Sequence, residues 1–111
     1  MNCLFCAIVA GEIPAAKVKE TANVLAFNDI NPQAPTHVLV IPKNHFENAA
    51  ELSASDSQSL SEIFAVAHEI AQENSLTGYR TVFNTGADAG QSVFHAHLHL
   101  LGGRALQWPP G

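Results

Sequence analysis

Charged residues are scarce in this chain, and basic residues are the scarcest. Asp, Glu, Lys and Arg make up only 14% of the 111 residues, and the five basic residues are outnumbered by ten acidic ones. The formal net charge is therefore -5. A protein that binds a nucleic-acid polymer normally presents a basic stripe, so this balance argues against such a partner. It still allows a single nucleotide, whose phosphate can be held by backbone N–H groups and a few local donors.

Long apolar runs are also missing, and there are only two cysteines. The longest apolar runs are too short to cross a bilayer, so we expect no membrane partner. The first residues, MNCLFCAIVAG, carry no basic segment before their apolar residues. That start differs from a signal peptide, and we expect a cytoplasmic protein under reducing conditions. Hydrophobic residues make up 47% of the chain, which is enough for the core of a single domain covering residues 1–111.

The pattern of apolar and turn-forming residues predicts an α+β fold, in which antiparallel strands are interrupted by one long helix. The expected strands cover residues 15–20, 23–30, 36–42, 79–84 and 93–103. A helical i, i+3, i+4 spacing of apolar residues begins near Ser55 and is expected to end at Thr77 and Gly78. Ser55 and Gln58 form a candidate capping box at its start.

Three of the six histidines alternate in the stretch HAHLHLL, residues 95–101. Side chains alternate across a strand, so His95, His97 and His99 share one face and the apolar residues between them share the other. A phosphate or a metal ion could contact such a face. His97 is central, and a neutral imidazole is both a nucleophile and a base near neutral pH. A flanking imidazole could then steady phosphoryl oxygens.

The loop before the histidines has the composition of an anion-binding loop. Gly86 and Gly90 permit close backbone approach to an anion, and Ser92 adds a hydroxyl donor. Asn84 offers an amide at the entrance of the loop. Two further histidines receive structural interpretations: His37 within a strand, and His68 beside the apolar stripe of the helix.

The motifs HAHLHLL, FNDINPQAPTHVLVIPKNH, NTGADAGQSVFHAHLHLLGGR and the ending WPPG occur in the order found in a known family. Over nearly its whole length the chain resembles the histidine triad (HIT) superfamily, and in particular its Hint branch. The resemblance implies a homodimer with a HIT-like fold, in which each subunit supplies five strands to one continuous antiparallel sheet. It also implies a nucleotide hydrolase or transferase without an organic cofactor.

Carried over by position, the resemblance makes His97 the nucleophile that attacks the α-phosphorus and forms a nucleotidyl-histidine. His99 and Ser92 would hold phosphate oxygens or assist the leaving group. Asp29 matches a carboxylate that binds ribose, and its two oxygens could accept from both vicinal hydroxyls. The other nucleotide-binding candidates are Asn84, Gly90 and Gln91 near the phosphate, and Phe5, Ile8, Phe27 and Ile30 around the base. Asn28 departs from the family pattern, because some Hint proteins carry histidine there.

Cys3 and Cys6 form a C-x-x-C pair, a spacing that suits a zinc site or a redox pair. His45 and His95 would complete a Cys2His2 zinc set, and zinc-bearing members of the superfamily use the corresponding residues. Many Hint proteins lack the cysteines, and there the same histidines have a structural or proton-relay role, so His95 is also a catalytic candidate. Free thiols and a disulfide therefore remain as alternatives to a structural zinc.

The leading function is hydrolysis of the P–N bond in purine nucleoside 5′-phosphoramidates. The alternatives are a dinucleoside polyphosphate hydrolase, a non-enzymatic nucleotide-binding or scaffold module, and a metalloenzyme that uses the triplet as a metal face. The tail, residues 105–111, carries the only tryptophan, Trp108. In the Hint branch this tail reaches the active site of the partner subunit, so we expect Trp108 to contact the partner.

Overall fold

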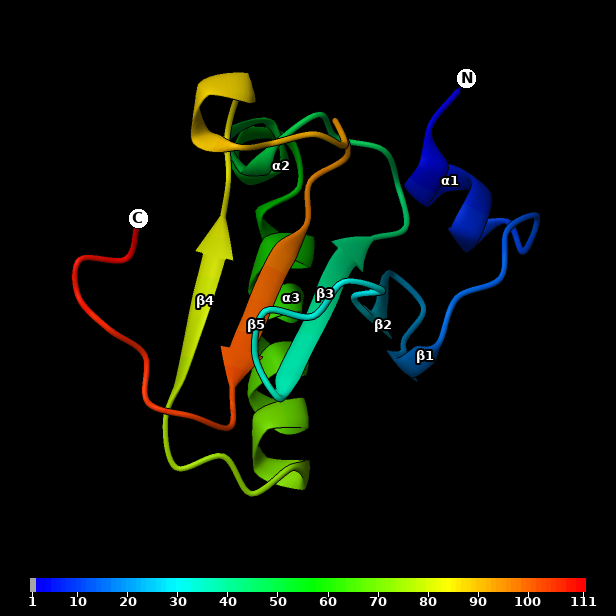
Figure 1. The fold of residues 1–111 in the computed structure, drawn as a ribbon. Coiled ribbons are helices and arrows are strands. Elements are labelled where there is room, and N and C mark those ends of the chain that lie inside the picture. Colours follow the sequence, from blue (N-terminus) through cyan, green and yellow to red (C-terminus); the bar gives the residue numbers. More distant parts are fainter. Residues whose placement is uncertain (1) are drawn as a thin grey trace.

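The computed structural model describes residues 2–111 and has a five-stranded antiparallel sheet with the order β1-β2-β3-β5-β4 (Figure 1). The strands are β1 Lys17–Glu20, β2 Val24–Asn28, β3 Thr36–Pro42, β4 Tyr79–Phe83 and β5 Leu98–Gly102. The helices are α1 Leu4–Val9, α2 Ala49–Ser55 and α3 Ser57–Glu73, and a 3-10 turn, η1, covers Ala87–Ala89. The predicted α+β class with five antiparallel strands is confirmed.

The helical content differs from the prediction of one long helix. Helix α3 is that helix, but it begins after Asp56, whose side chain accepts a hydrogen bond from the backbone N–H of Ser59. Ser55 instead ends α2, and Asp56 takes the N-cap position of α3 in place of the predicted Ser55 and Gln58 box. No helix within residues 2–111 combines the length and apolar character that crossing a membrane requires.

The C-terminal end of α3 lies earlier than predicted. The helix ends at Glu73, and Ser75 adopts a left-handed φ of 55°. The backbone N–H groups of Ser75 and Leu76 donate to the carbonyls of Gln72 and Ala71. This is a Schellman motif, which satisfies the last helical carbonyls without the glycine that usually occupies the left-handed position.

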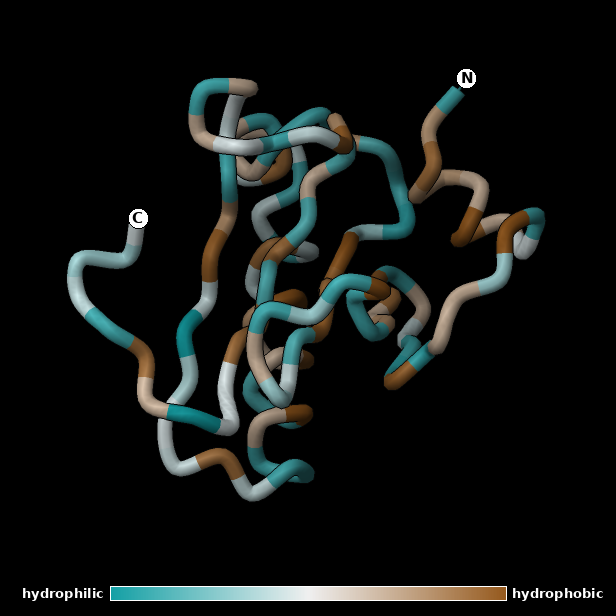
Figure 2. Tube along the Cα trace, viewed as in Figure 1, coloured by the Kyte–Doolittle hydropathy of each residue, from teal (hydrophilic) through white to brown (hydrophobic). Residues whose placement is uncertain are grey.

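The sheet separates two apolar clusters. The first lies between the sheet and α3 and contains Val24, Ala26, Val38, Val40, Leu52, Ile63, Val66, Ala67, Ile70, Ala96, Leu98 and Leu100. The second lies under α1 on the other face and contains Phe5, Ile8, Leu25, Phe27, Leu39 and Ile41. In Figure 2 the central strands and α1 carry brown, hydrophobic segments, whereas the connection from β3 to α2 is mostly teal. Both faces of the central strands are therefore buried.

The last strand is shorter than predicted, because β5 begins only at Leu98. His95 and His97 precede it in a segment that is not part of the strand. The backbone N–H of Ala96, between them, donates to the Phe46 carbonyl at 2.7 Å and holds this segment in place. The predicted alternation survives this change: Ala96, Leu98 and Leu100 all pack into the α3-side cluster. The histidines face the side of the sheet that α1 covers.

Candidate active site and metal site

His97 is 8% exposed, and a backbone carbonyl orients its ring. The Nδ1 of His97 lies 2.8 Å from the carbonyl oxygen of His95, so Nδ1 must carry the proton and donate. The Nε2 of neutral His97 is then unprotonated and has a free lone pair. The ring of Phe5 packs edge-on against His97 at a centroid distance of 5.1 Å. A fixed imidazole with its Nε2 lone pair free has the form that a nucleophile needs.

His99 is oriented by His37, which lies 62 residues away in sequence on the adjacent strand β3. The backbone N–H of Gln33 donates to His37 Nδ1 at 3.0 Å, so the proton of neutral His37 is on Nε2. This Nε2–H donates to His99 Nδ1 at 2.9 Å. Neutral His99 must therefore carry its own proton on Nε2, which is buried and has no hydrogen-bond partner within residues 2–111. His99 presents an unused donor beside His97, whose ring centroid is 5.0 Å away.

Burial keeps the rings of His37 and His99 neutral. Burial, followed by the neighbouring His97 and His37 rings, lowers the pKa of His99 to about 4, although Asp29 acts in the opposite direction. Burial also lowers the pKa of His37, against the pull of the same carboxylate. Asp29 Oδ2 lies 3.4 Å from His37 Nε2, and Asp29 Oδ1 accepts from the Asn31 backbone N–H at 2.8 Å. The tautomers described above are those of a neutral pair at physiological pH.

The sequence interpretation of His37 as purely structural missed this contact with His99. A pattern in the sequence shows that His37 alternates with Leu39 and Ile41 on one face of its strand. It does not show that this strand is hydrogen-bonded to the strand of His99. His68, in contrast, is exposed on α3 and bonds to the Tyr79 hydroxyl, which agrees with its interpretation.

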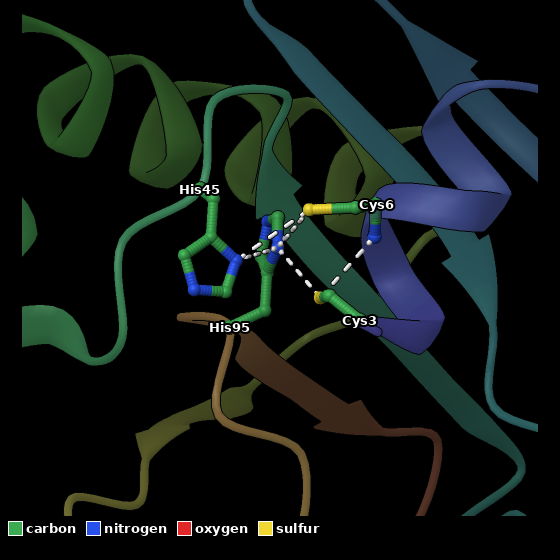
Figure 3. Close-up of side chains that lie close together, drawn as sticks. All are labelled: Cys3, Cys6, His45 and His95. Atoms are coloured by element: carbon green, nitrogen blue, oxygen red, sulfur yellow. Dashed lines mark hydrogen bonds between the residues drawn. The ribbon is translucent and has the colours of Figure 1, made fainter. Parts of the chain in front are cut away.

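A second cluster brings Cys3, Cys6, His45 and His95 together (Figure 3), with all four potential ligand atoms within 4.8 Å of one another. His95 Nδ1 lies 3.4 Å from Cys3 Sγ, 3.6 Å from Cys6 Sγ and 3.3 Å from His45 Nδ1. Cys6 Sγ lies 3.5 Å from His45 Nδ1. Ligand atoms around a tetrahedral zinc are separated by roughly 3.3 to 3.8 Å, given its usual bond lengths.

The protonation of His95 also suits a metal. Its ring is fully buried, and Nε2 lies 2.8 Å from the Pro42 carbonyl oxygen, to which it donates. Nδ1 of neutral His95 therefore has its lone pair directed at the two sulfurs and His45. A metal-binding histidine commonly donates its other N–H to a carbonyl in this way. Cys3 additionally caps α1, since its Sγ accepts from the Cys6 N–H at 3.3 Å.

The loop that carries Gly90, Gln91 and Ser92 reaches the same region. Gly90 has a left-handed φ of 96°, and a Cβ placed there would lie 4.0 Å from Asn84 Nδ2. The buried Gln91 side chain accepts from the Gly86 N–H and donates to the carbonyls of Glu47 and Val93, so its hydrogen bonds hold the loop itself. Ser92 is exposed and lines a cavity of about 400 Å³ beside Cys3 and His45.

The residues predicted around the base divide into two groups. Phe5, Ile8 and Phe27 are 4–6% exposed and belong to the cluster under α1. Phe5 and Phe27 pack edge-on at 5.5 Å, so together they form an apolar wall next to His97. Ile30, in contrast, is fully exposed after the end of β2. Trp108 in the tail is 82% exposed.

Known proteins resemble this chain along almost its whole length. The family model "Scavenger mRNA decapping enzyme C-term binding" matches residues 2–106. A HIT-like protein of Synechococcus elongatus is 50% identical over 109 residues, which cover 97% of this chain and 96% of that protein. A 14 kDa zinc-binding protein of Zea mays is 46% identical over 111 residues, covering 97% and 87%.

A solved structure agrees with these sequence matches. The HIT family hydrolase of Legionella pneumophila is 54% identical, and the match covers 99% of this chain and all of that one with a TM-score of 0.94. Identity at this level over full length shows common ancestry as well as a common fold. With its alternating histidines His95, His97 and His99 and these relatives, the chain belongs to the histidine triad superfamily.

Proposed function

We propose that the protein is a nucleotide hydrolase of the Hint type that cleaves the P–N bond of purine nucleoside 5′-phosphoramidates. The observation that carries the proposal is the tautomer of His97, whose Nδ1–H is engaged by the His95 carbonyl and whose Nε2 lone pair is free. The name of the Legionella relative, a HIT family hydrolase, supports hydrolysis. The resemblance of the motifs around His97 to the Hint branch supports the phosphoramidate as substrate.

In the proposed reaction the Nε2 lone pair of His97 forms a bond to the α-phosphorus while the P–N bond to the amine breaks. The amine leaves with a proton, which the exposed Ser92 hydroxyl relays from solvent. The unpaired Nε2–H of His99 donates to a phosphoryl oxygen as charge develops there. Water then attacks the phosphorus of the nucleotidyl-histidine while the bond from Nε2 to phosphorus breaks. The water releases one proton to solvent, and the products are the nucleoside monophosphate and neutral His97.

The nucleotide contacts in this proposal use the residues around the histidines. Asp29 accepts from the ribose hydroxyls, since each of its oxygens has capacity beyond its present partner. The Gly90 backbone and the Asn84 amide contact the phosphate. The wall of Phe5 and Phe27 packs against the base, and the exposed Ile30 closes over it from the other side.

We further propose one structural zinc per subunit, held by Cys3, Cys6, His45 and His95. Their separations match a tetrahedral site, and the relative from Zea mays is named a zinc-binding protein. Four protein ligands leave no open position for a substrate, so the zinc would contribute to stability. It would fix the His95 ring, while the carbonyl of the same residue holds the nucleophile His97.

We also propose a homodimer in which the sheet continues through β4. This strand is at the edge of the sheet, where its outer backbone N–H and C=O groups are open to another strand. Exposed aromatic side chains surround the edge: Tyr79 on β4, Phe64 on α3 and Trp108 in the tail. An antiparallel contact across β4 would bury them, and it would bring the tail close to the histidines of the partner.

The test of the proposed reaction compares His97→Ala with the matched control His68→Ala, which removes an exposed histidine from α3. Adenosine 5′-phosphoramidate and a dinucleoside tetraphosphate are offered to each protein, and nucleotide release is followed. Wild type and control should release AMP from the phosphoramidate, and His97→Ala should lose several orders of magnitude in rate. More than about a tenth of the rate remaining in His97→Ala, or faster turnover of the tetraphosphate, contradicts the proposal.

A further inference from the structure

Gln91 is a buried amide in the connection from β4 to β5, and its side chain is 4% exposed. Its Nε2 donates to the carbonyls of Glu47 and Val93 at 2.8 and 3.1 Å. Its Oε1 accepts from the backbone N–H of Gly86 at 2.9 Å. Both N–H groups of the amide are thus used, so no donor of this side chain remains for the phosphate of a nucleotide.

The bond between Gly86 and Gln91 closes the loop of residues 86–91. The backbone N–H of Gln91 also donates to the Gly86 carbonyl, at 3.1 Å, so two hydrogen bonds join the ends of this loop. The loop contains η1, and Gly86 and Gly90 have left-handed φ values of 89° and 96°. Apart from η1 it belongs to no helix or strand, so the Gln91 amide supplies the fixation that a backbone ladder supplies elsewhere.

The two carbonyls that accept from the Gln91 amide belong to the segments that carry two of the site histidines. Glu47 follows His45 by two residues, and Val93 precedes His95 by two residues. A single side chain therefore connects the loop to both segments. Because the side chain is buried and its three partners are backbone groups, it fixes the position of the loop relative to the histidines.

The residues that follow Gln91 present free donors on the side of the histidines. Ser92 is exposed, whereas the Val93 side chain packs against the cluster under α1, in which Phe5 contacts His97. The backbone N–H groups of Ser92 and Val93 donate to no backbone carbonyl within residues 2–111. Successive free N–H groups in a loop form a binding site for an oxyanion.

We propose that Gln91 is a positioning residue that holds the N–H groups of Ser92 and Val93 toward the α-phosphate without contacting the nucleotide. The inference rests on the nucleotide site of the proposed function, which it extends to a residue outside that site. Donors that are fixed before the ligand arrives bind it more strongly than donors that the ligand must order. Loss of the Gln91 amide therefore weakens the contribution of the phosphate to binding and leaves that of the nucleoside.

The experiment compares Gln91→Met, which keeps the length of the side chain and removes the amide, with Gln58→Met at an exposed position of α3 as the matched control. NMR titrations measure the Kd of AMP and of adenosine, which lacks the phosphate. Gln91→Met should reduce the preference for AMP over adenosine at least about tenfold, with the Kd of adenosine changed less than about twofold. A purely structural role would weaken both ligands alike, and Gln58→Met should keep the wild-type preference.

Gly86→Ala tests the same closure from the other end of the loop and leaves the buried amide in place. A Cβ at Gly86 meets no atom within 4 Å, but a φ of 89° is strained for alanine, so the preference for AMP should fall here too. This variant decides the question if Gln91→Met does not fold.

An unchanged preference for AMP in these variants, or an equal loss of affinity for both ligands, overturns the positioning role. A wild-type protein that binds AMP no more tightly than adenosine also overturns it. The reaction is judged separately with adenosine 5′-phosphoramidate. A wild type that releases no AMP from this substrate, but whose preference for AMP is lost in Gln91→Met, contradicts the proposed function and supports the role of Gln91.

Discussion

His99 should make the protein less stable as the pH falls below about 6.5. Its pKa is lowered from 6.5 to about 4 by burial, by His97 and by His37. In the unfolded chain the ring takes up a proton below pH 6.5, whereas in the folded protein it stays neutral down to about pH 4. The unfolded state thus binds more protons in this window, so the free energy of unfolding rises with pH and its full value is reached above about 6.5.

These two pKa values imply a loss of about 1.8 kcal/mol between about pH 7 and pH 5. Partial solvent access to the half-buried ring reduces the expectation to about 1 kcal/mol. His99→Phe replaces the titrating ring by an apolar one, so its stability should depend less on pH by this amount. Urea unfolding of both proteins at the two pH values measures the difference.

His37 and His95, whose pKa values burial also lowers, are present in both proteins, so their effects largely cancel in the difference. His68→Phe, which removes an exposed histidine, should behave like wild type. Equal losses of stability in wild type and His99→Phe would refute the reasoning. The NMR chemical shifts of the His99 ring, followed as a function of pH, provide an independent measurement. At about pH 5 they should still be those of a neutral imidazole.

Three further outcomes are expected. Cys6→Ser should no longer contain stoichiometric zinc by elemental analysis, and its Tm should be lower than that of wild type by more than about 5 °C. A wild-type Tm that a chelator does not change would contradict a structural metal. Ile70→Ala removes a fully buried side chain and should lower the free energy of unfolding by about 2–5 kcal/mol. Ile30→Ala changes a fully exposed position and should lower it by less than about 0.5 kcal/mol. Equal losses in the two variants would contradict the assigned core. Deletion of residues 106–111 should change the relative rates for small and bulky amine leaving groups more than the affinity for AMP, and unchanged relative rates would contradict a role of the tail.

The fold class follows from the sequence because its main elements have clear periodicity. The range predicted for the third strand, residues 36–42, is the range of β3, and the apolar spacing of α3 is recognisable without tertiary contacts. Helices α1 and α2 were not predicted, since six and seven residues are too few to show a helical period. Their stability depends on packing and on the caps Cys3 and Asn48.

The alternation of residues 95–101 determines by itself that the histidines face away from Ala96, Leu98 and Leu100, because side chains of an extended chain alternate by geometry. The same sequence also determines which residue types are available for a nucleophile and a metal set. These are local properties, and they hold wherever the segment lies in the fold.

For His95 and His99, only the tertiary structure decides which ring nitrogen carries the proton. The carbonyl of Pro42 fixes the tautomer of His95, and the backbone N–H of Gln33, acting through His37, fixes that of His99. These partners come from distant parts of the chain, and hydrogen-bond direction depends on positions in space that no spacing rule encodes.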